Sequence, residues 1–201
     1  MAARIAVLAS GGGTNLQAII DYYAAITLQG EAAGSIELVA SNRENAGALD
    51  RARGAGIPAE SFDATDDGTA LGNLLAKRSI DLVVLAGYLK RIPAPVIRAF
   101  HGRIINIHPG MLPDFGGPGM YGSHVHAAVL ASGATSTGVT VHFVDAEYDH
   151  GPVIAQWRVR VKIDDTAESL AGRVLSAEHI VYPRIVDMVC ALNGAGLTAD
   201  F

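Results

Sequence analysis

The clearest candidate for chemistry is residues 106–109, which read Asn-Ile-His-Pro and place an amide and an imidazole two positions apart. In a β-strand such residues project from the same face, so Asn106 and His108 would share one surface while Ile105 and Ile107 face the other. An amide N–H can stabilise negative charge on oxygen, and an imidazole can move a proton near neutral pH. The pair is a candidate catalytic site, although both residues could instead cap a strand end and bond the following loop.

A third candidate is Asp149, which lies in an acidic turn at residues 145–152. A carboxylate that reached His108 would orient the imidazole and favour its protonated form. The local sequence does not show that contact, because Asp145, Glu147 and Asp149 could equally form a solvated turn.

Residues 10–15, which read Ser-Gly-Gly-Gly-Thr-Asn, suggest a different chemistry, the binding of an anion. Glycines let the backbone approach a phosphate, and the start of the following helix supplies free N–H groups, aided by the Thr14 hydroxyl and the Asn15 amide. The segment lacks the lysine of a P-loop, and Leu16 replaces the last glycine of a dinucleotide fingerprint. An ordinary tight turn with a helix cap is the alternative.

Two other motifs do not support a site. Residues 117–122 fit the spacing G-x-G-x-x-G but follow a loop rich in glycine and proline, so we interpret them as a false match. His124 and His126 would diverge on the helix expected there, and neither a cysteine nor a carboxylate lies at ligand spacing, so we expect no metal. No motif for a covalent nucleophile is present.

The elements that must position these residues alternate along the chain. We expect strands at residues 4–9, 36–40, 82–86, 103–108, 138–144 and 153–161, and helices at 14–23, 46–55, 65–78, 93–100, 123–132 and 165–192. Asp165 and Glu168 are expected to form a capping box for the last helix. This order predicts an α/β fold, with a mostly parallel, Rossmann-like sheet, helices on both faces and an antiparallel edge in the C-terminal half. Residues 109–122 are expected to form a long functional loop.

Composition sets the broad class. The 201 residues and 20.9 kDa suit a single domain over 1–201, half of the residues are apolar, and no run approaches the length of a membrane helix. The formal net charge of −5 argues against nucleic-acid or anionic-membrane partners. Cys190 cannot form an internal disulfide, and its apolar neighbours predict a buried thiol, which favours a reducing, cytoplasmic setting.

The chain resembles the folate-dependent formyltransferases over essentially its whole length. The segments that carry this resemblance are 10–20, 85–90, 105–113, 140–144, 148–154 and 178–183, in the order found in that family. The Asn-x-His-Pro and Asp-x-Gly-Pro segments are shared across the family. The glycine loop and the Glu-His-x-x-Tyr-Pro segment at 178–183 are similar to those of the phosphoribosylglycinamide formyltransferases.

The resemblance implies the formyltransferase fold and the transfer of a formyl group from 10-formyltetrahydrofolate, the co-substrate, to the amine of 5-phosphoribosylglycinamide, without a metal. It places Asn106, His108 and Asp149 at catalytic positions, and Glu178 at the ribose hydroxyls. It assigns the binding of the substrate phosphate to Gly13, Thr14 and Asn15. The resemblance also assigns folate-binding positions: Leu89, Lys90, Arg91, Ile92, Asn106, Asp145, Ala146, Glu147, Tyr148 and Asp149. Leu85, Ile97, Ile104 and Val144 are candidates for an apolar lining, although each could equally be a core residue.

The resemblance implies that residues 1–100 form the side of the domain that binds the nucleotide phosphate. Residues 101–201 would form the side that binds the folate and carries the catalytic residues. The expected partners are small-molecule substrates, and the chain would be a monomer or a homodimer. Two departures concern the loop. Gly110 stands where the family commonly has serine, and residues 114–123 are richer in glycine and slightly longer than in the commonest members.

Three alternatives differ in sequence features. Hydrolases of 10-formyltetrahydrofolate carry an N-terminal regulatory domain, whereas the first strand here is expected at Arg4. Methionyl-tRNA formyltransferases carry a C-terminal nucleic-acid domain, and a net charge of −5 does not suit tRNA. A non-catalytic nucleotide-binding module would need the glycine loop but not Asn106, His108 and Asp149 together.

Overall fold

A computed structural model of the chain describes residues 2–195, in which seven strands form one sheet in the order β3-β2-β1-β4-β5-β6-β7. The first five strands are parallel, and β6 and β7 add an antiparallel edge, as the sequence predicts. The strands are β1 (Ala3–Leu8), β2 (Gly34–Ser41), β3 (Ala59–Ser61), β4 (Leu82–Leu85), β5 (Ile104–His108), β6 (Ser136–Phe143) and β7 (Val153–Arg160).

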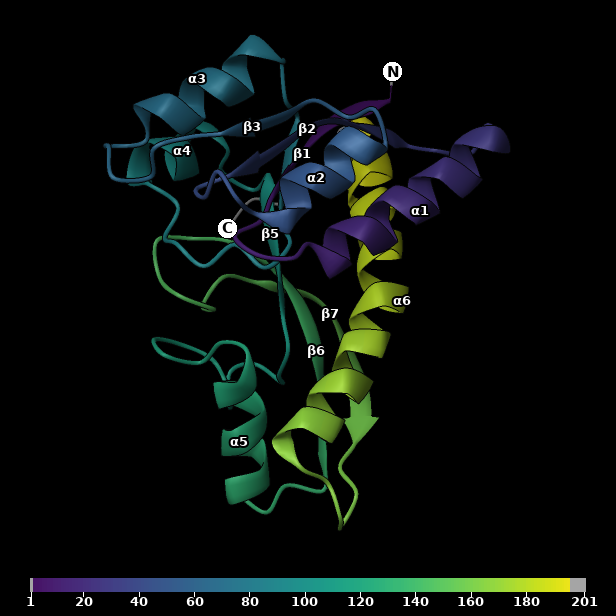
Figure 1. Ribbon diagram of the computed structural model, residues 1–201, viewed down its shortest axis with the longest axis vertical. Coiled ribbons are helices and arrows are strands. Elements are labelled where there is room, and N and C mark those ends of the chain that lie inside the picture. Colours follow the sequence, from purple (N-terminus) through teal and green to yellow (C-terminus); the bar gives the residue numbers. More distant parts are fainter. Residues whose placement is uncertain (1, 196–201) are drawn as a thin grey trace.

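Helices cover both faces of the sheet (Figure 1). One face packs against residues of α1, α2, α5 and α6, and the other packs against α3 and α4. The helices are α1 (Thr14–Leu28), α2 (Gly47–Gly54), α3 (Thr69–Lys77), α4 (Ala94–Ala99), α5 (Ser123–Ala131) and α6 (Ala167–Gly194). Because helices lie on both sides, the central strands are apolar at almost every position: in β1, Ile5 and Val7 face one core while Ala6 and Leu8 face the other.

The longest helix, α6, packs against both the parallel and the antiparallel parts of the sheet. It runs along most of the molecule in Figure 1 and contacts β1, β2, β6 and β7. The hydroxyl of Tyr182, fully buried, donates to the carbonyls of Leu85 in β4 and Ile105 in β5, at 2.9 and 3.3 Å. These bonds hold the ends of the two strands beside which the candidate catalytic residues lie.

Three expected details differ. The capping box of α6 is formed by Thr166 and Ser169, whereas the Asp165 carboxylate accepts from the Lys162 N–H at 2.7 Å and pairs with Arg173. The expectation of an Asp165–Glu168 box is therefore wrong, because Asp165 closes the preceding turn instead.

The other two differences concern short segments. The helix expected at 65–78 begins only at Thr69, because the carboxylates of Asp66 and Asp67 accept from N–H groups two residues ahead and hold residues 65–68 in turns. The edge strand β3 was not expected, since Ala-Glu-Ser carries no strand-forming side chains. Residues 109–122 form the irregular loop that was predicted, and Cys190 is buried as expected.

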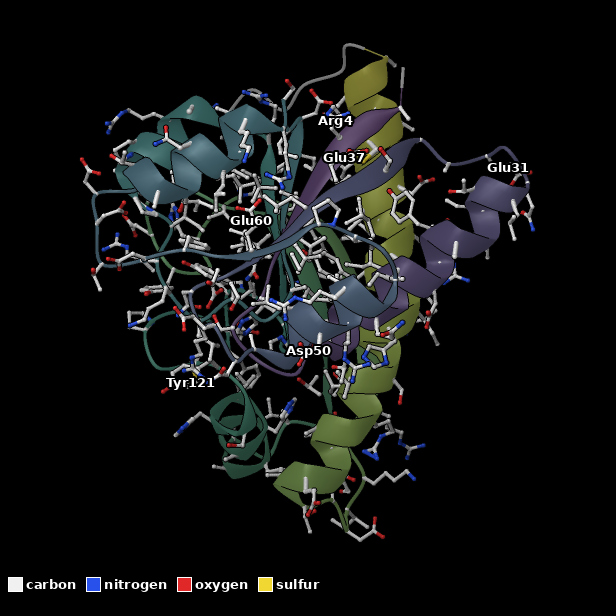
Figure 2. All side chains as sticks on the ribbon, turned by 45° about the horizontal axis from the view of Figure 1, so that its top comes forward. Arg4, Glu31, Glu37, Asp50, Glu60 and Tyr121 are labelled. Carbon is white, nitrogen blue, oxygen red and sulfur yellow. The ribbon has the colours of Figure 1, made fainter. Side chains whose placement is uncertain are left out.

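Polar contacts of Arg4 hold the amino end of β1. Arg4 and Glu37, on the neighbouring strands β1 and β2, form an ion pair of 3.2 Å and lie close together in Figure 2. The backbone N–H of Arg4 also donates to the Asp81 carboxylate at 2.8 Å. These contacts fix the amino ends of the parallel strands and leave the carboxyl ends free. Within residues 2–195, no helix is both long and apolar enough to cross a membrane.

Candidate active site

A cleft of about 990 Å³ opens at the carboxyl ends of β4 and β5, where open α/β sheets bind ligands. Its walls are residues 85–92, 117–123 and 144–149, together with the first turns of α6. Asn106, His108 and Asp149 all line it. The structure thus brings together the three residues predicted to be catalytic, and β5 presents Asn106 and His108 on one face as the strand period requires.

The long loop fixes both partners of the pair formed by His108 and Asp149. His108 Nδ1 lies 3.5 Å from Asp149 Oδ2, and His108 Nε2 lies 2.7 Å from the Phe115 carbonyl. A carbonyl can only accept, so Nε2 carries a hydrogen and Nδ1 of the neutral ring carries the lone pair. The Gly117 N–H donates to Asp149 Oδ2 at 3.0 Å. The proton-accepting atom of His108 therefore faces the carboxylate.

Burial controls the ionisation of this pair. Burial lowers the pKa of His108 below its usual value, and the nearby Asp149 carboxylate only partly opposes this. Asp149 thus favours the protonated form of His108, as expected, but desolvation of the imidazolium outweighs the attraction. Burial alone would raise the pKa of Asp149, but contacts with His142, His108 and the Gly117 N–H outweigh it, so this pKa lies below its usual value.

His142 joins this site although the sequence assigned it no role. It lies opposite Asn106 in the antiparallel register of β5 and β6, and it is 2% exposed. The Asn106 amide nitrogen lies 3.1 Å from His142 Nε2, and Asp149 Oδ1 lies 3.6 Å from the same atom. The signal that could have found His142 was its place in segment 140–144, at a position of β6 that faces the predicted catalytic surface.

Of the residues predicted to bind the nucleotide, Asn15 has a side-chain partner within the protein. The Asn15 amide donates to Glu178 Oε2 at 2.6 Å, so this amide hydrogen is used inside the protein and not on a phosphate. Both residues line the cleft, and burial raises the pKa of Glu178. At the start of α1, the N–H groups of the first turn have no side-chain cap. The backbone there remains suited to an anion.

Gly13 adopts a left-handed conformation, with φ of 75°, at the start of α1. A Cβ atom at this position would lie 2.7 Å from the Ala48 Cα, which no side chain can occupy without displacing α2. The loop therefore needs glycine for both its conformation and its packing. Gly11 and Gly12 line a separate hollow of about 470 Å³ with residues 43–47.

The predicted folate segments form two facing walls of the cleft. All of residues 89–92 and 145–149 line it, and Arg91 spans from one wall to the other: its guanidinium donates to the Ala146 carbonyl and lies 5.7 Å from the centre of the Tyr148 ring. Of the four candidate apolar residues, Leu85 and Val144 line the cleft. Ile104 is a core residue and Ile97 packs against the same core, so those two assignments are wrong.

Sequence reasoning also missed one wall and one histidine. Ala167, Glu168, Ala171, Gly172 and Leu175 line the cleft from α6, at spacings that put them on the same helix face as Glu178. That spacing was the available signal. His126, 4% exposed, lines the cleft from α5, and Tyr121 on the preceding loop is exposed at its edge (Figure 2). Among residues 2–195, no three His, Cys, Asp or Glu side chains are grouped to hold a metal ion.

Comparison with known proteins agrees with this geometry. The formyl transferase family matches residues 3–186, which include every side chain named at the cleft. The chain belongs to the formyl transferase family. The fold is therefore that of a formyl transferase, a family that takes its formyl group from a folate derivative.

Individual formyl transferases resemble the chain closely. It is 44% identical to a chloroplastic phosphoribosylglycinamide formyltransferase from Arabidopsis thaliana, over 93% of this chain and 65% of that protein. The chain thus spans less than two thirds of that relative. It is 37% identical to phosphoribosylglycinamide formyltransferase from Escherichia coli, over 90% of this chain and 84% of that one. The crystal structure of glycinamide ribonucleotide transformylase 1 from Symbiobacterium toebii matches with a TM-score of 0.84 and 39% identity, covering 94% and 88% of the two chains.

We expect the formyl transferase to lose stability as the pH falls below about 6.5, the usual pKa of histidine. Burial lowers the pKa of His108 and of His126, so the unfolded chain binds protons in this range that the folded state does not. Each residue then destabilises the fold by at most about 1.4 kcal/mol per pH unit, from pH 6.5 down to its folded pKa. Glu178, whose pKa is raised, acts in the opposite direction and offsets part of this loss.

The measurement is urea unfolding between pH 7.5 and 5.5. The free energy of unfolding should fall with pH in the wild type and fall less steeply in His126→Gln, which cannot take up the proton. A constant or rising stability over this range would contradict the prediction.

Proposed function

We propose that the protein transfers the formyl group of 10-formyltetrahydrofolate to the amine of 5-phosphoribosylglycinamide, a step of purine synthesis. The observation that carries this proposal is the convergence of Asn106, His108 and Asp149 in one cleft, between the two predicted folate walls and the pair formed by Asn15 and Glu178. The names of the relatives support the same reaction. All of residues 1–201 are proposed to serve this one activity.

In the first step the substrate amine attacks the formyl carbon, forming a C–N bond and moving the carbonyl electron pair onto oxygen. Asn106 uses one amide hydrogen toward His142, and its second hydrogen is available to the cleft. This second N–H stabilises the developing oxyanion, and removing a donor of this type typically costs about 10²–10³ in rate. The walls of the cleft hold amine and carbon in contact, which supplies a further part of the acceleration.

In the second step the intermediate must lose a proton from the attacking nitrogen and deliver one to N10 of the folate. His108 Nδ1 is the acceptor, because burial favours the neutral imidazole and the Nδ1 lone pair lies 3.5 Å from the carboxylate of Asp149, which also lines the cleft. The imidazolium that forms is stabilised by the Asp149 carboxylate. It then returns the proton as the C–N10 bond breaks, giving tetrahydrofolate and the formylated amine.

The nucleotide and the folate occupy opposite sides of this centre. The N–H groups of Gly13, Thr14 and Asn15 at the uncapped start of α1 hold the phosphate, and the Glu178 carboxylate accepts from ribose hydroxyls. The folate lies between residues 89–92 and 145–149, against the apolar Leu85 and Val144.

The test is consumption of 10-formyltetrahydrofolate, followed spectrophotometrically with and without 5-phosphoribosylglycinamide. Turnover that requires the nucleotide supports the proposed transfer. Equal consumption without it, with release of formate, would instead show hydrolysis. No consumption in either case would contradict an enzymatic role with this donor.

We expect Thr14→Ala and Asn15→Ala to raise the KM for 5-phosphoribosylglycinamide selectively. Thr14 contributes its hydroxyl to the phosphate loop, and Asn15→Ala additionally leaves the Glu178 carboxylate without its 2.6 Å donor. A lost hydrogen bond to a charged group is worth about 1.5–3 kcal/mol, roughly a tenfold to hundredfold rise in KM. Steady-state kinetics with each substrate varied in turn provides the check, and an equal effect on the KM of both substrates would contradict the assignment.

A further inference from the structure

We propose that His142 is a positioning residue for formyl transfer, which acts by fixing the orientation of the Asn106 amide. This inference rests on the function proposed above. It starts from the antiparallel pairing of β5 and β6, which sets Asn106 directly opposite His142. The two side chains are neighbours on the catalytic face although they lie 36 positions apart in the sequence.

The hydrogen bonds of the imidazole define its tautomer. His142 Nδ1 lies 2.7 Å from the carbonyl oxygen of Phe143, which can only accept. Nδ1 therefore carries the hydrogen, and Nε2 of the neutral ring must accept. At 3.1 Å from Nε2, the Asn106 side chain must then present its NH₂ group and not its oxygen.

This orientation has a consequence for catalysis. With one amide hydrogen directed at His142, the planar NH₂ group holds its second hydrogen in a fixed direction, available to an oxyanion in the cleft. If the amide rotated by half a turn, it would present Oδ1 where its nitrogen now lies, opposite the Nε2 lone pair. His142 thus selects one of two amide orientations that differ little in shape but place opposite charges there.

Burial strengthens this selection. His142 is 2% exposed, so water cannot replace the imidazole as an acceptor without rearrangement of the strand pair. Asp149 Oδ1 lies 3.6 Å from the same Nε2 atom, on the side of His108. A proton on Nε2 would turn toward this carboxylate and repel the Asn106 NH₂ group. Of the two forms, only the neutral Nδ1–H form can accept from the Asn106 NH₂ group.

The kinetic test is a double-mutant cycle between His142→Phe and Asn106→Ala. Phenylalanine fills the space but offers no acceptor, so His142→Phe should lower kcat by on the order of 10- to 100-fold, less than loss of the whole donor. The KM values should change less than about twofold. In the Asn106→Ala background the same substitution should lower kcat by less than about threefold, because its target is gone. Equal effects in both backgrounds would overturn the proposal.

Two further variants separate positioning from simple support of the strand. His142→Gln places an amide oxygen near the position of Nε2 and should recover most of the lost kcat. Val141→Ala removes buried bulk from the adjacent position of β6. It should lower the melting temperature but leave kcat within about twofold. If Val141→Ala lowered kcat as much as His142→Phe, strand stability and not orientation would account for the loss.

The tautomer is measured independently of activity. In protein labelled with ¹⁵N in histidine, His142 should show a protonated Nδ1 and an unprotonated Nε2 at pH 7.5, with assignment by its absence from His142→Phe. A protonated Nε2 would overturn the proposal. A wild-type protein that formylates no nucleotide would contradict the proposed function instead, and the tautomer would still decide whether His142 orients Asn106.

Discussion

Replacing His108 with alanine is expected to lower kcat for formyl transfer by about 10²–10⁴, the usual contribution of a positioned acid–base group. The variant removes the lone pair at Nδ1 that accepts the amine proton and lies 3.5 Å from Asp149 Oδ2. The KM of each substrate should change little, because the loop glycines and Glu178 remain in place. Steady-state kinetics on the purified variant measures both effects.

The control for His108→Ala is His101→Ala, which removes an exposed imidazole outside the walls of the cleft. Its kcat should match the wild type. Because the alanine variant leaves a space where the ring was, added imidazole should partly restore its turnover. Near-normal kcat in folded His108→Ala would refute the proposed role of this residue.

The second large effect is expected from Asp149→Asn, which should also lower kcat by about 10²–10³, within the range for acid–base groups. Asparagine keeps the shape and can still accept from the Gly117 N–H, but it cannot stabilise the imidazolium. Burial lowers the pKa of His108, and the carboxylate is the stronger of the two groups that oppose this, so its loss leaves only the Phe115 carbonyl in opposition. The acidic limb of the profile of kcat/KM against pH should therefore move to lower pH.

The direction of that movement distinguishes two roles for Asp149. If the carboxylate were itself the proton acceptor, its replacement would abolish the limb instead of moving it. Asp114→Asn is the matched control, because it removes one negative charge at an exposed position of the loop 109–122, which packs against Asp149 through Gly117. A profile shifted equally by both variants would indicate a general charge effect and would contradict a specific pairing with His108.

The sequence predicted the parts of this protein that depend on local periodicity. The alternation of apolar strands and helices gave the parallel sheet, and the strand period of two put Asn106 and His108 on one face. The contact of Asp149 with His108 came only from the family resemblance. It depends on a turn in which Asp149 itself adopts a left-handed backbone conformation, with φ of 54°, and no local pattern predicts that bend.

What the sequence could not predict depends on contacts between distant segments. His108 is neutral because the loop around Phe115 buries its imidazole. The Asn15 amide is not free to bind a phosphate because it donates to Glu178 on α6. Ile97 and Ile104 are apolar like the true lining residues, and composition cannot separate the core from a cleft wall. The start of α6 was equally ambiguous at Asp165, because Asp165 and Thr166 are adjacent and either could have served as the N-cap.

The pairing of β5 with β6 also determines which changes of length the chain can accept. Asn106 and His142 meet through strand register, so the number of residues between the two strands does not affect their contact. Insertions or deletions within the loop at 110–122 could reshape the entrance and leave the pair intact. A single deletion inside residues 136–141 would turn His142 to the opposite face of the sheet. The strand pair must therefore be kept, together with Phe115 and Gly117, which hold His108 and Asp149. The rest of the loop is the part in which new acceptor preferences could be introduced.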